Sequence, residues 1–430
     1  MSYSELLARR KRRQERKGIT VHDSAIHPSL KPFQREIVHR ALEAGRHAIW
    51  ADTGLGKTRM MIEWARLTSG GLRLIVAPLA VCLQTVEEAA SIGVGVTYVR
   101  SAADVTGPGI WITNFEMVPE LAGIEWDAVA LDEASILKQS DGKTRKMLIE
   151  TFSTAKYRTT WTATPAPNDP EELTNQAEFL GVMTRTNMLA AYFVHDSDAG
   201  WRLKGHAVEP MLDWMSTWAI AIRMPSELGD SDEGYVLPGL NIIPEIVHAD
   251  VKPDDGELFA ATVGGVSGRA RVRRETLSAR VERAAQLTQD GEQWCLWVGL
   301  NDEADALAKA IPDAVNIHGS LAPEVKAQGL HDFAKGRTRV LITKPAIAAM
   351  GLNFQSCSRT AFVGLGDSYE QYYQAIRRFY RFGQTEVVNA HIVLSALEQT
   401  IAHNVMRKER QANAITDGLI QRLNTTRKAA

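Results

Sequence analysis

The chain has 430 residues, of which 45% are hydrophobic and 23% charged, and its formal net charge at pH 7 is −2. This length exceeds a single ordinary core, so it favours about two or three globular domains. The near-balance of charges excludes net charge as evidence for a polyanionic partner. The three cysteines have no paired spacing, which argues against a disulfide framework or a zinc site and fits a reducing cytoplasm.

Location and the N-terminal charges give two further expectations. No apolar run approaches the ~18 residues that cross a bilayer, and no apolar segment of a secretory signal follows the N-terminal cations. We therefore expect a cytoplasmic protein. Residues 9–17, RRKRRQERK, place seven cations in nine positions. This block can attract phosphates, although a solvated terminal helix explains it equally well.

The first half of the chain alternates short apolar runs with helical patterns. Residues 57–67 and 79–90 have helical periodicity and lie between apolar runs. Strands that alternate with helices indicate a parallel sheet covered on both faces. The expected strands are HAIWA (47–51), LRLIVAP (72–78), VTYVR (96–100), GIWITN (109–114), AVALDE (128–133) and YRTTWTAT (157–164).

The alternation stops near Met183 and resumes after Leu240, which predicts a helical insertion and a Gly/Asp/Ser-rich linker between two similar α/β halves. The insertion contains Trp201, Trp214 and Trp218, which could stack on nucleic-acid bases, although burial in a core is the favoured role. We expect the segment 396–426 to be a long helix packed on the second half. The expected strands of that half are WCLWVG (294–299), AVNIHG (314–319), RVLITK (339–344), RTAFVG (359–364) and VVNAHIVL (387–394).

Residues 51–58, ADTGLGKT, form a variant of the phosphate-binding loop pattern, with Ala51 at the usual first glycine. A strand before the turn and a helix after it are the context that the pattern requires. The turn and the helix N-terminus can point N–H groups at an anion, the Lys57 ammonium can bind the β- and γ-phosphates, and the Thr58 hydroxyl can hold Mg²⁺. The expected nucleotide-binding residues here are Thr53, Gly54, Leu55, Gly56, Lys57 and Thr58.

Two acidic residues, Asp132 and Glu133, follow the apolar run of AVALDEAS. The carboxyl end of a parallel strand is the edge at which ligands bind. We expect Asp132 to hold Mg²⁺ and Glu133 to orient and deprotonate the attacking water. An acidic pair at the start of an exposed helix is the simpler alternative, but the pair and the phosphate loop together favour hydrolysis.

The stretch QAIRRFYRFGQ (374–384) offers residues that can neutralise charge in the transition state. The helical spacing of Gln374, Arg377/Arg378 and Arg381 predicts one shared face. A basic amphipathic helix would explain the charge, but not the glutamines. We expect Gln374, Arg378 and Arg381 to be catalytic.

These motifs, in this order, resemble helicase superfamily two, and most closely its Swi/Snf-like branch of double-stranded-DNA translocases. The resemblance covers about Leu30 to Leu397. It implies two RecA-like α/β domains with ATP and Mg²⁺ in the cleft between them. The expected divisions are a basic N-terminal extension (1–28), RecA-like domain 1 (29–183), the helical insertion and linker (184–240), and RecA-like domain 2 with the C-terminal helix (241–430).

In the first half, the resemblance assigns three further roles. In LKPFQREIV (30–38), it implies that Gln34 reads adenine. In LIVAPLAVCLQTVEEA (74–89), it places Pro78 near the nucleic-acid strand. In WTATPAPNDPEEL (161–173), it makes Thr162 and Thr164 coupling residues, with Thr162 among the nucleic-acid contacts.

In the second half, IHGSL (317–321) resembles the motif in which His318 and Gly319 approach the strand backbone. In LITKPAIAAMGLNFQ (341–355), the resemblance implies that Thr343 contacts nucleic acid and that Gly351 and Asn353 lie at the cleft. Lys344 and Pro345 stand where the branch more often has small residues, and Arg377 stands where it usually has aspartate.

The function that this resemblance implies is an ATP-dependent DNA motor, with duplex or branched DNA favoured and RNA as an alternative. A strand-separating helicase is a second reading, and a slowly hydrolysing nucleotide-dependent regulator is a third. The compact chain fits a bacterial or phage setting and a core motor that relies on a protein partner to choose its target.

Overall fold

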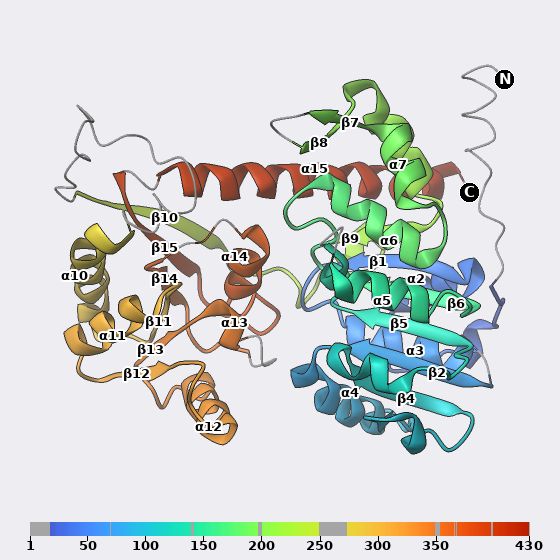
Figure 1. Cartoon of the computed structure of the whole chain (residues 1–430), viewed down its shortest axis with the longest axis horizontal. Coiled ribbons are helices and arrows are strands. Elements are labelled where there is room, and N and C mark those ends of the chain that lie inside the picture. The colour runs from blue at the N-terminus through green and yellow to red at the C-terminus, as the bar shows by residue number, and fades with distance from the viewer. Residues whose placement is uncertain are drawn as a thin grey trace. The chain divides into compact units, whose positions relative to one another are not determined.

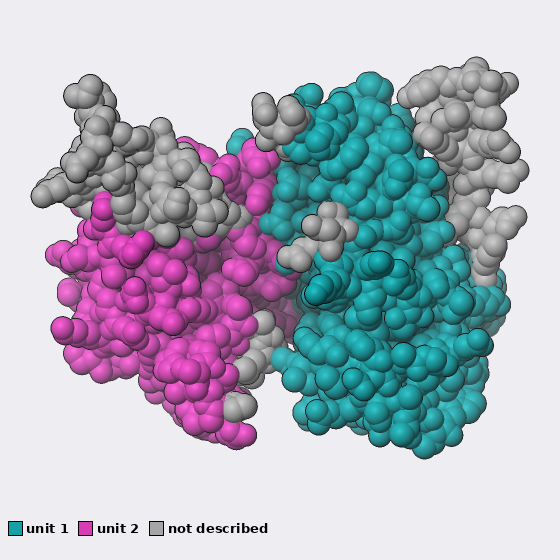
Figure 2. Space-filling view, in the orientation of Figure 1, with its two compact units in different colours: residues 1–235, 410–430 teal, residues 236–409 magenta. Residues whose placement is uncertain are grey.

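The computed structural model describes residues 18–68, 70–138, 142–196, 200–248, 273–348, 353–364, 366, 368–396 and 399–429. The chain divides into two compact units, which Figure 2 colours separately. Unit 1 contains Met1–Tyr235 and Arg410–Ala430, and unit 2 contains Val236–Glu409. The basic block at residues 9–17 lies outside the described residues.

Unit 1 is built on a seven-stranded sheet in the order β3-β4-β2-β5-β6-β1-β9 (Figure 1). Every neighbouring pair in this sheet is parallel, so the carboxyl ends of all its strands lie at one edge. The strands are β1 (Arg46–Ala51), β2 (Leu72–Ala77), β3 (Thr97–Tyr98), β4 (Gly109–Asn114), β5 (Ala128–Asp132), β6 (Tyr157–Trp161) and β9 (Ala219–Ile222).

Hydrophobic cores cover both faces of this sheet. Ile49 and Ile75 belong to the core that includes helices α2 to α4, whereas Trp50 and Val76 belong to the core that includes α5 to α8. Successive residues of a strand point to opposite faces, which explains why most residues of these strands are apolar. The helices are α2 (Pro32–Ala44), α3 (Lys57–Thr68), α4 (Leu79–Ser91), α5 (Lys143–Thr151), α6 (Leu173–Leu180), α7 (Arg185–Tyr192) and α8 (Val208–Met215).

The segment 184–240 differs from the predicted helical insertion and linker. Its residues Ala219–Ile222 form β9, which pairs with β1 in parallel and completes the sheet of unit 1. It also contains an antiparallel hairpin of β7 (Phe193–Asp196) and β8 (Gly200–Leu203). The burial expected of its tryptophans holds for Trp218, which is 0% exposed and packs edge-on against Trp50.

Unit 2 contains a six-stranded sheet in the order β10-β15-β14-β11-β13-β12, again with parallel neighbours throughout. Two parallel α/β sheets, the fold class expected from the sequence, are thus confirmed. The strands are β10 (Leu240–Val247), β11 (Trp294–Trp297), β12 (Ala314–Ile317), β13 (Val340–Thr343), β14 (Arg359–Phe362) and β15 (Val388–Ser395). The helices are α10 (Leu277–Leu287), α11 (Asn301–Ala310), α12 (Pro323–Ala334), α13 (Pro345–Ala348) and α14 (Tyr369–Ile376).

The last helix, α15 (Gln399–Ala429), begins in unit 2, but its residues from Arg410 onward belong to unit 1. Ile415, Leu419 and Ile420 enter one hydrophobic core of unit 1, and Leu423 enters the other. The expectation that this helix packs on the second half was therefore wrong for its C-terminal part. Among the described residues, no helix has both the length and the hydropathy that crossing a membrane requires.

Candidate functional site

The glycine-rich turn of unit 1 joins the end of β1 at Ala51 to the start of α3 at Lys57. Gly54 and Gly56 have φ angles of 87° and 80°. This left-handed region is strained for residues with a Cβ atom, which explains glycine at both positions. A turn of this kind that leads into a helix N-terminus suits a bound anion, as the sequence predicts.

The Lys57 ammonium lies at the same turn and donates hydrogen bonds to the carbonyl oxygens of Ala51 at 2.8 Å and Asp52 at 3.1 Å. The Asp52 carboxylate accepts a hydrogen bond from the backbone N–H of Thr53 at 2.6 Å, which fixes the start of the turn. Lys57 therefore remains beside the phosphate loop rather than extending into solvent.

Asp132 ends β5, and Glu133 follows it immediately. The Glu133 backbone N–H donates to Asp132 Oδ1 at 3.1 Å. Burial raises the pKa of Asp132, while the charge of Lys57 and the Glu133 N–H act in the opposite direction. Since β5 and β1 both neighbour β6, the strand order brings the acidic pair and the phosphate loop to one edge of the sheet.

Two threonines follow β6 at this edge. The Thr162 backbone N–H donates to the carbonyl oxygen of Ile49 at 3.1 Å, and Thr162 Oγ1 accepts from the Thr164 N–H at 3.1 Å. The side chains of Thr162 and Thr164 are 0% and 4% exposed. Thr162 therefore links the end of β6 to β1, the strand that leads into the phosphate loop. Direct contact of Thr162 with nucleic acid would require a different conformation.

Helix α6 holds two loops at this edge of the sheet, the loop after β5 and the loop after β6. The sequence analysis did not identify this role. Gln176 is 1% exposed, accepts a hydrogen bond from Trp50 Nε1 at 3.0 Å and donates to the Pro165 carbonyl oxygen at 2.8 Å. Asn175 donates to the Leu137 carbonyl oxygen at 2.8 Å. Two neighbouring amide side chains in this short helix were the signal that could have identified them.

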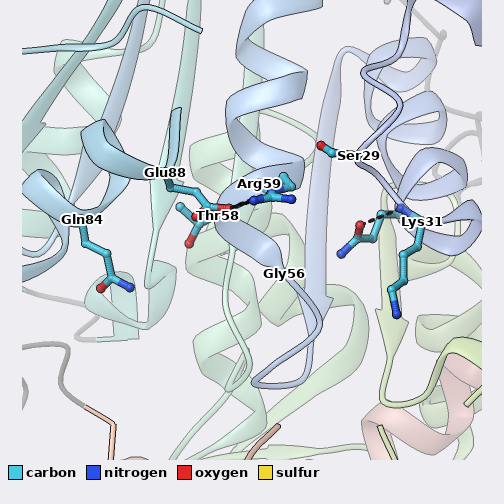
Figure 3. Close-up of a pocket in the computed structure, with 8 residues that line it drawn as sticks. Ser29, Lys31, Gly56, Thr58, Arg59, Gln84 and Glu88 are labelled. Carbon is cyan, nitrogen blue, oxygen red and sulfur yellow. Dashed lines mark hydrogen bonds and ion pairs between the residues drawn. The ribbon is translucent and has the colours of Figure 1, made fainter. Parts of the chain in front are cut away.

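A pocket of about 300 Å³ adjoins the phosphate loop in unit 1 (Figure 3). It contains the expected Gln34, Gly56 and Thr58, and it adds residues that sequence reasoning did not find. The Arg59 guanidinium pairs with the Glu88 carboxylate at 2.7 Å on its wall. The lining residues are Ser29, Lys31, Gln34, Gly56, Thr58, Arg59, Gln84 and Glu88.

Gln34 connects this pocket to the phosphate loop. Its side-chain amide donates to the carbonyl oxygen of Leu55 at 2.9 Å, and its Oε1 accepts the Lys31 backbone N–H at 2.9 Å. Gln34 is 6% exposed. The residue expected to read adenine is therefore held at the border of the pocket by two hydrogen bonds.

In unit 2, the arginine motif does not form the continuous helix face predicted from its spacing. Helix α14 contains Gln374 but ends at Ile376, so Arg378 and Arg381 lie in the turns that follow. The Arg381 guanidinium donates to Asn353 Oδ1, and burial lowers the pKa of Arg381. This contact joins the segment of Asn353 to that of Arg381, while Gly351 lies outside the described residues.

The expected nucleic-acid residues of unit 2 meet at the carboxyl ends of β12 and β13, where Ile317 pairs with Thr343. His318 Nδ1 lies 2.8 Å from the Ser320 hydroxyl, and Gly319 is exposed. Thr343 is 1% exposed, and its hydroxyl donates to the Ile317 carbonyl oxygen at 3.0 Å. His318 and Gly319 are accessible to a strand, but the Thr343 side chain is not accessible in this conformation.

The expected strand contact of unit 1, Pro78, directly precedes α4 and is partly exposed. Leu79 and Leu83 on that helix are 60% and 65% exposed. The beginning of α4 therefore presents an accessible surface, as a strand contact requires.

Each of the two units contains a segment that matches a known protein family. Residues 42–190 match the model of the SNF2-related domain, and residues 279–383 match the helicase conserved C-terminal domain. Together these matches cover more than half of the chain. No curated protein sequence matches it.

One similar solved structure is the SWI2/SNF2 ATPase core of Sulfolobus solfataricus in complex with dsDNA. It is 17% identical, with 94% of this chain and 97% of that chain covered and a TM-score of 0.45. On the two domain matches, the chain belongs to the Swi/Snf-like branch of helicase superfamily two. It is accordingly a DNA-dependent ATPase.

Proposed function

We propose that this chain is an ATP-dependent motor that moves along DNA, with duplex or branched DNA as its track. The observation that carries the proposal is the arrangement of three neighbouring strands of unit 1. At the carboxyl ends of β1, β6 and β5 lie Lys57, Thr162 and Asp132, respectively. This arrangement supplies a phosphate site, a coupling loop and a metal ligand at one edge of a sheet in a Swi/Snf-like chain.

The phosphate loop would bind the triphosphate through its backbone N–H groups and the Lys57 ammonium. The Thr58 hydroxyl and the Asp132 carboxylate would hold Mg²⁺, which neutralises charge on the phosphate oxygens when it is bound. Their chemistry fits that ion, because Mg²⁺ usually takes about one or two protein oxygens and completes its octahedron with phosphate and water. The pocket beside Gln34 would hold the adenine base.

In the hydrolytic step, Glu133 would accept a proton from water while the water oxygen attacks the γ-phosphorus. The bond between that phosphorus and the ADP oxygen breaks, giving ADP and phosphate. Arg378 and Arg381 would neutralise charge that spreads over the γ-phosphate oxygens, and Gln374 would support them. These catalytic roles rest on the motif positions and on the Arg381–Asn353 contact.

Movement requires that ATP bind one arrangement of the motor better than another, so that hydrolysis alternates between two grips on the track. Pro78 in unit 1 and His318 and Gly319 in unit 2 would contact the sugar–phosphate backbone. Thr162 and Thr343 would contribute after release of their present buried contacts. Binding through phosphates predicts little sequence preference and an affinity that falls as salt rises.

The test is the ATP hydrolysis rate of the full chain with single-stranded DNA, duplex DNA, forked DNA or RNA. We expect duplex or forked DNA to stimulate most. The Glu133→Gln variant should bind ATP but turn over at least about a hundredfold more slowly, because the general base is lost. No stimulation by any nucleic acid would contradict the motor and favour a slowly hydrolysing regulator.

A second assay separates translocation from strand separation. A translocase should displace the third strand of a DNA triplex without unwinding a plain duplex. Duplex unwinding at a rate that tracks ATP use would instead establish a strand-separating helicase. A protein partner that selects the target would reveal itself as a further rise in hydrolysis at fixed DNA concentration.

A further inference from the structure

Glu63 is a fully buried acidic residue in helix α3, the helix that begins with Lys57, and its side chain is 0% exposed. Burial of a carboxylate is costly unless the charge is paired and hydrogen-bonded. Arg66 supplies the charge, since its Nε and Nη2 atoms donate to Glu63 at 2.8 Å and 2.7 Å. Only the carboxylate of this pair is buried, because the Arg66 side chain is 34% exposed, and the other contact of Glu63 indicates what the buried acid holds in place.

A second partner of Glu63 lies in the segment before α2. The His27 backbone N–H donates to Glu63 Oε1 at 2.7 Å. Arg66 reinforces this link by donating to the carbonyl oxygen of Ala25. Two hydrogen bonds thus tie residues 25–27 to helix α3, although these segments are far apart in the sequence.

The tied segment continues directly into the wall of the nucleotide pocket. The Leu30 N–H donates to the His27 carbonyl oxygen at 3.1 Å, and His27 Nδ1 lies 2.7 Å from the Ser29 hydroxyl. Ser29 and Lys31 both line the pocket. Any movement of His27 away from α3 would therefore move this part of the wall.

The other end of the same wall is held by Gln34, which bonds the Lys31 N–H and the Leu55 carbonyl oxygen. Two residues therefore anchor this wall. Gln34 connects it to the phosphate loop, and Glu63 connects it to α3, the helix that follows the loop. Only the first anchor belongs to a sequence motif that the resemblance identified.

We propose that Glu63 is a positioning residue for nucleotide recognition: it holds the turn His27–Leu30 against α3 and so fixes Ser29 and Lys31 in the base-side wall of the pocket. The inference rests on the proposed ATP-binding function. It assigns Glu63 no contact with the nucleotide, so its loss should weaken ATP binding while leaving the chemical step unchanged.

The experiment measures kcat and KM for ATP and for GTP with saturating duplex DNA, together with the melting temperature of each variant. Glu63→Ala should raise KM for ATP about tenfold, as expected for a lost hydrogen bond to a charged group, with kcat within about twofold of the wild type. KM for GTP should change less, so the preference for ATP should fall. A residue that served only stability would not shift KM and nucleotide preference at constant kcat.

Two conservative variants keep the test decisive if Glu63→Ala does not fold. Glu63→Gln retains an oxygen that accepts the His27 N–H, so its KM should stay within about twofold of the wild type. Glu63→Asp keeps the charge for Arg66 but withdraws the carboxylate from His27, so its KM should rise more. Glu36→Gln is the matched control, because it removes an acid from a partly exposed ion pair with Arg40.

An unchanged KM in folded Glu63→Asp, or a loss confined to kcat, would overturn the positioning role. Those outcomes differ from failure of the proposed function, in which ATP hydrolysis by the wild-type chain itself would show no stimulation by any nucleic acid.

Discussion

The backbone N–H of Glu133 donates a hydrogen bond to the carboxylate of Asp132 at 3.1 Å, which links the proposed general base to the proposed metal ligand. Glu133 has a φ angle of 48° and is the only non-glycine residue with positive φ in the part of the chain that the structure describes. A left-handed conformation costs an L-residue about 1–2 kcal/mol. The strain is located at the residue on which hydrolysis is expected to depend.

This backbone conformation predicts that glycine at position 133 preserves stability better than alanine, although both substitutions remove activity. Glu133→Gly and Glu133→Ala should both abolish hydrolysis, because neither can accept the proton from water. Glycine tolerates positive φ, so Glu133→Gly should be more stable than Glu133→Ala by about 1 kcal/mol. Urea unfolding of the two variants measures the difference. Equal stabilities would mean that the Glu133 backbone is not strained in solution.

The buried carboxylate of Asp132 predicts a pH-dependent effect on stability. Burial raises its pKa above the ordinary 3.8, so ionisation in the folded state costs stability as the pH rises from 3.8 through the folded pKa. Asp132→Asn should therefore be more stable than the wild type at pH 8, and the difference should shrink as the pH falls toward 3.8. The measurement is urea unfolding across this pH range without Mg²⁺ or nucleotide.

Asp313→Asn provides a control of opposite sign, because the Arg339 hydrogen bond lowers the pKa of the Asp313 carboxylate. Its ion pair stabilises the fold above the ordinary carboxylate pKa, and this contribution is lost as the pH falls. The control should be no more stable than the wild type at pH 8. An Asp132→Asn variant with the same pH dependence as this control would contradict the interpretation of Asp132.

The contact between Gly56 and Gln34 predicts a specific loss of nucleotide binding. A Cβ atom at Gly56 would lie 2.4 Å from Gln34 Nε2 and would displace the amide from the pocket border. Gly56→Ala should thus raise KM for ATP about tenfold or more, through loss of a buried hydrogen bond. Gly123 has a similar φ of 86° with no atom within 4 Å of an added Cβ, so Gly123→Ala should show the backbone strain alone. Similar KM values for the two variants would argue against a role of Gln34 in binding.

The proposed role of Arg381 in the transition state predicts a defect in chemistry rather than in ATP binding. Arg381→Ala should lower DNA-stimulated kcat by about 10³-fold or more, as expected for loss of an arginine finger, while the Kd for ATP stays near that of the wild type. Arg381→Lys should not restore the rate, because an ammonium lacks the planar donor fork. Arg337→Ala removes an exposed arginine paired with Asp332 and serves as the control. If the affinity for ATP fell as much as kcat, Arg381 would contribute to ATP binding rather than to the chemical step.

The sequence predicted most reliably what is encoded locally. The turn of ADTGLGKT, the apolar runs on either side and the acidic pair at the end of β5 are each specified within a few residues, and all lie where they were expected. Strand β9 is different, because four residues, AIAI, carry little periodicity and become a strand by pairing with β1, about 170 positions earlier in the chain. Whether a short apolar run of this kind forms a strand depends on the strand with which it pairs.

The same limit applies at the sites. Spacing could suggest a helical face for Gln374, Arg378 and Arg381, but it could not show that α14 ends at Ile376. Likewise, no local pattern connects Glu63 to His27 or Gln176 to Trp50. These contacts join segments that only the folded sheet brings together, so they require the structure.

The course of helix α15 has a consequence for the order in which the molecule can form during synthesis. The chain leaves unit 1 at Tyr235 and re-enters it only at Arg410. The ribosome therefore completes the whole of the second unit before it supplies Ile415, Leu419 and Leu423 to the cores of the first. Unit 1, although encoded first, should be the last to reach its final stability, and a nascent chain that stalls before this helix should remain sensitive to protease.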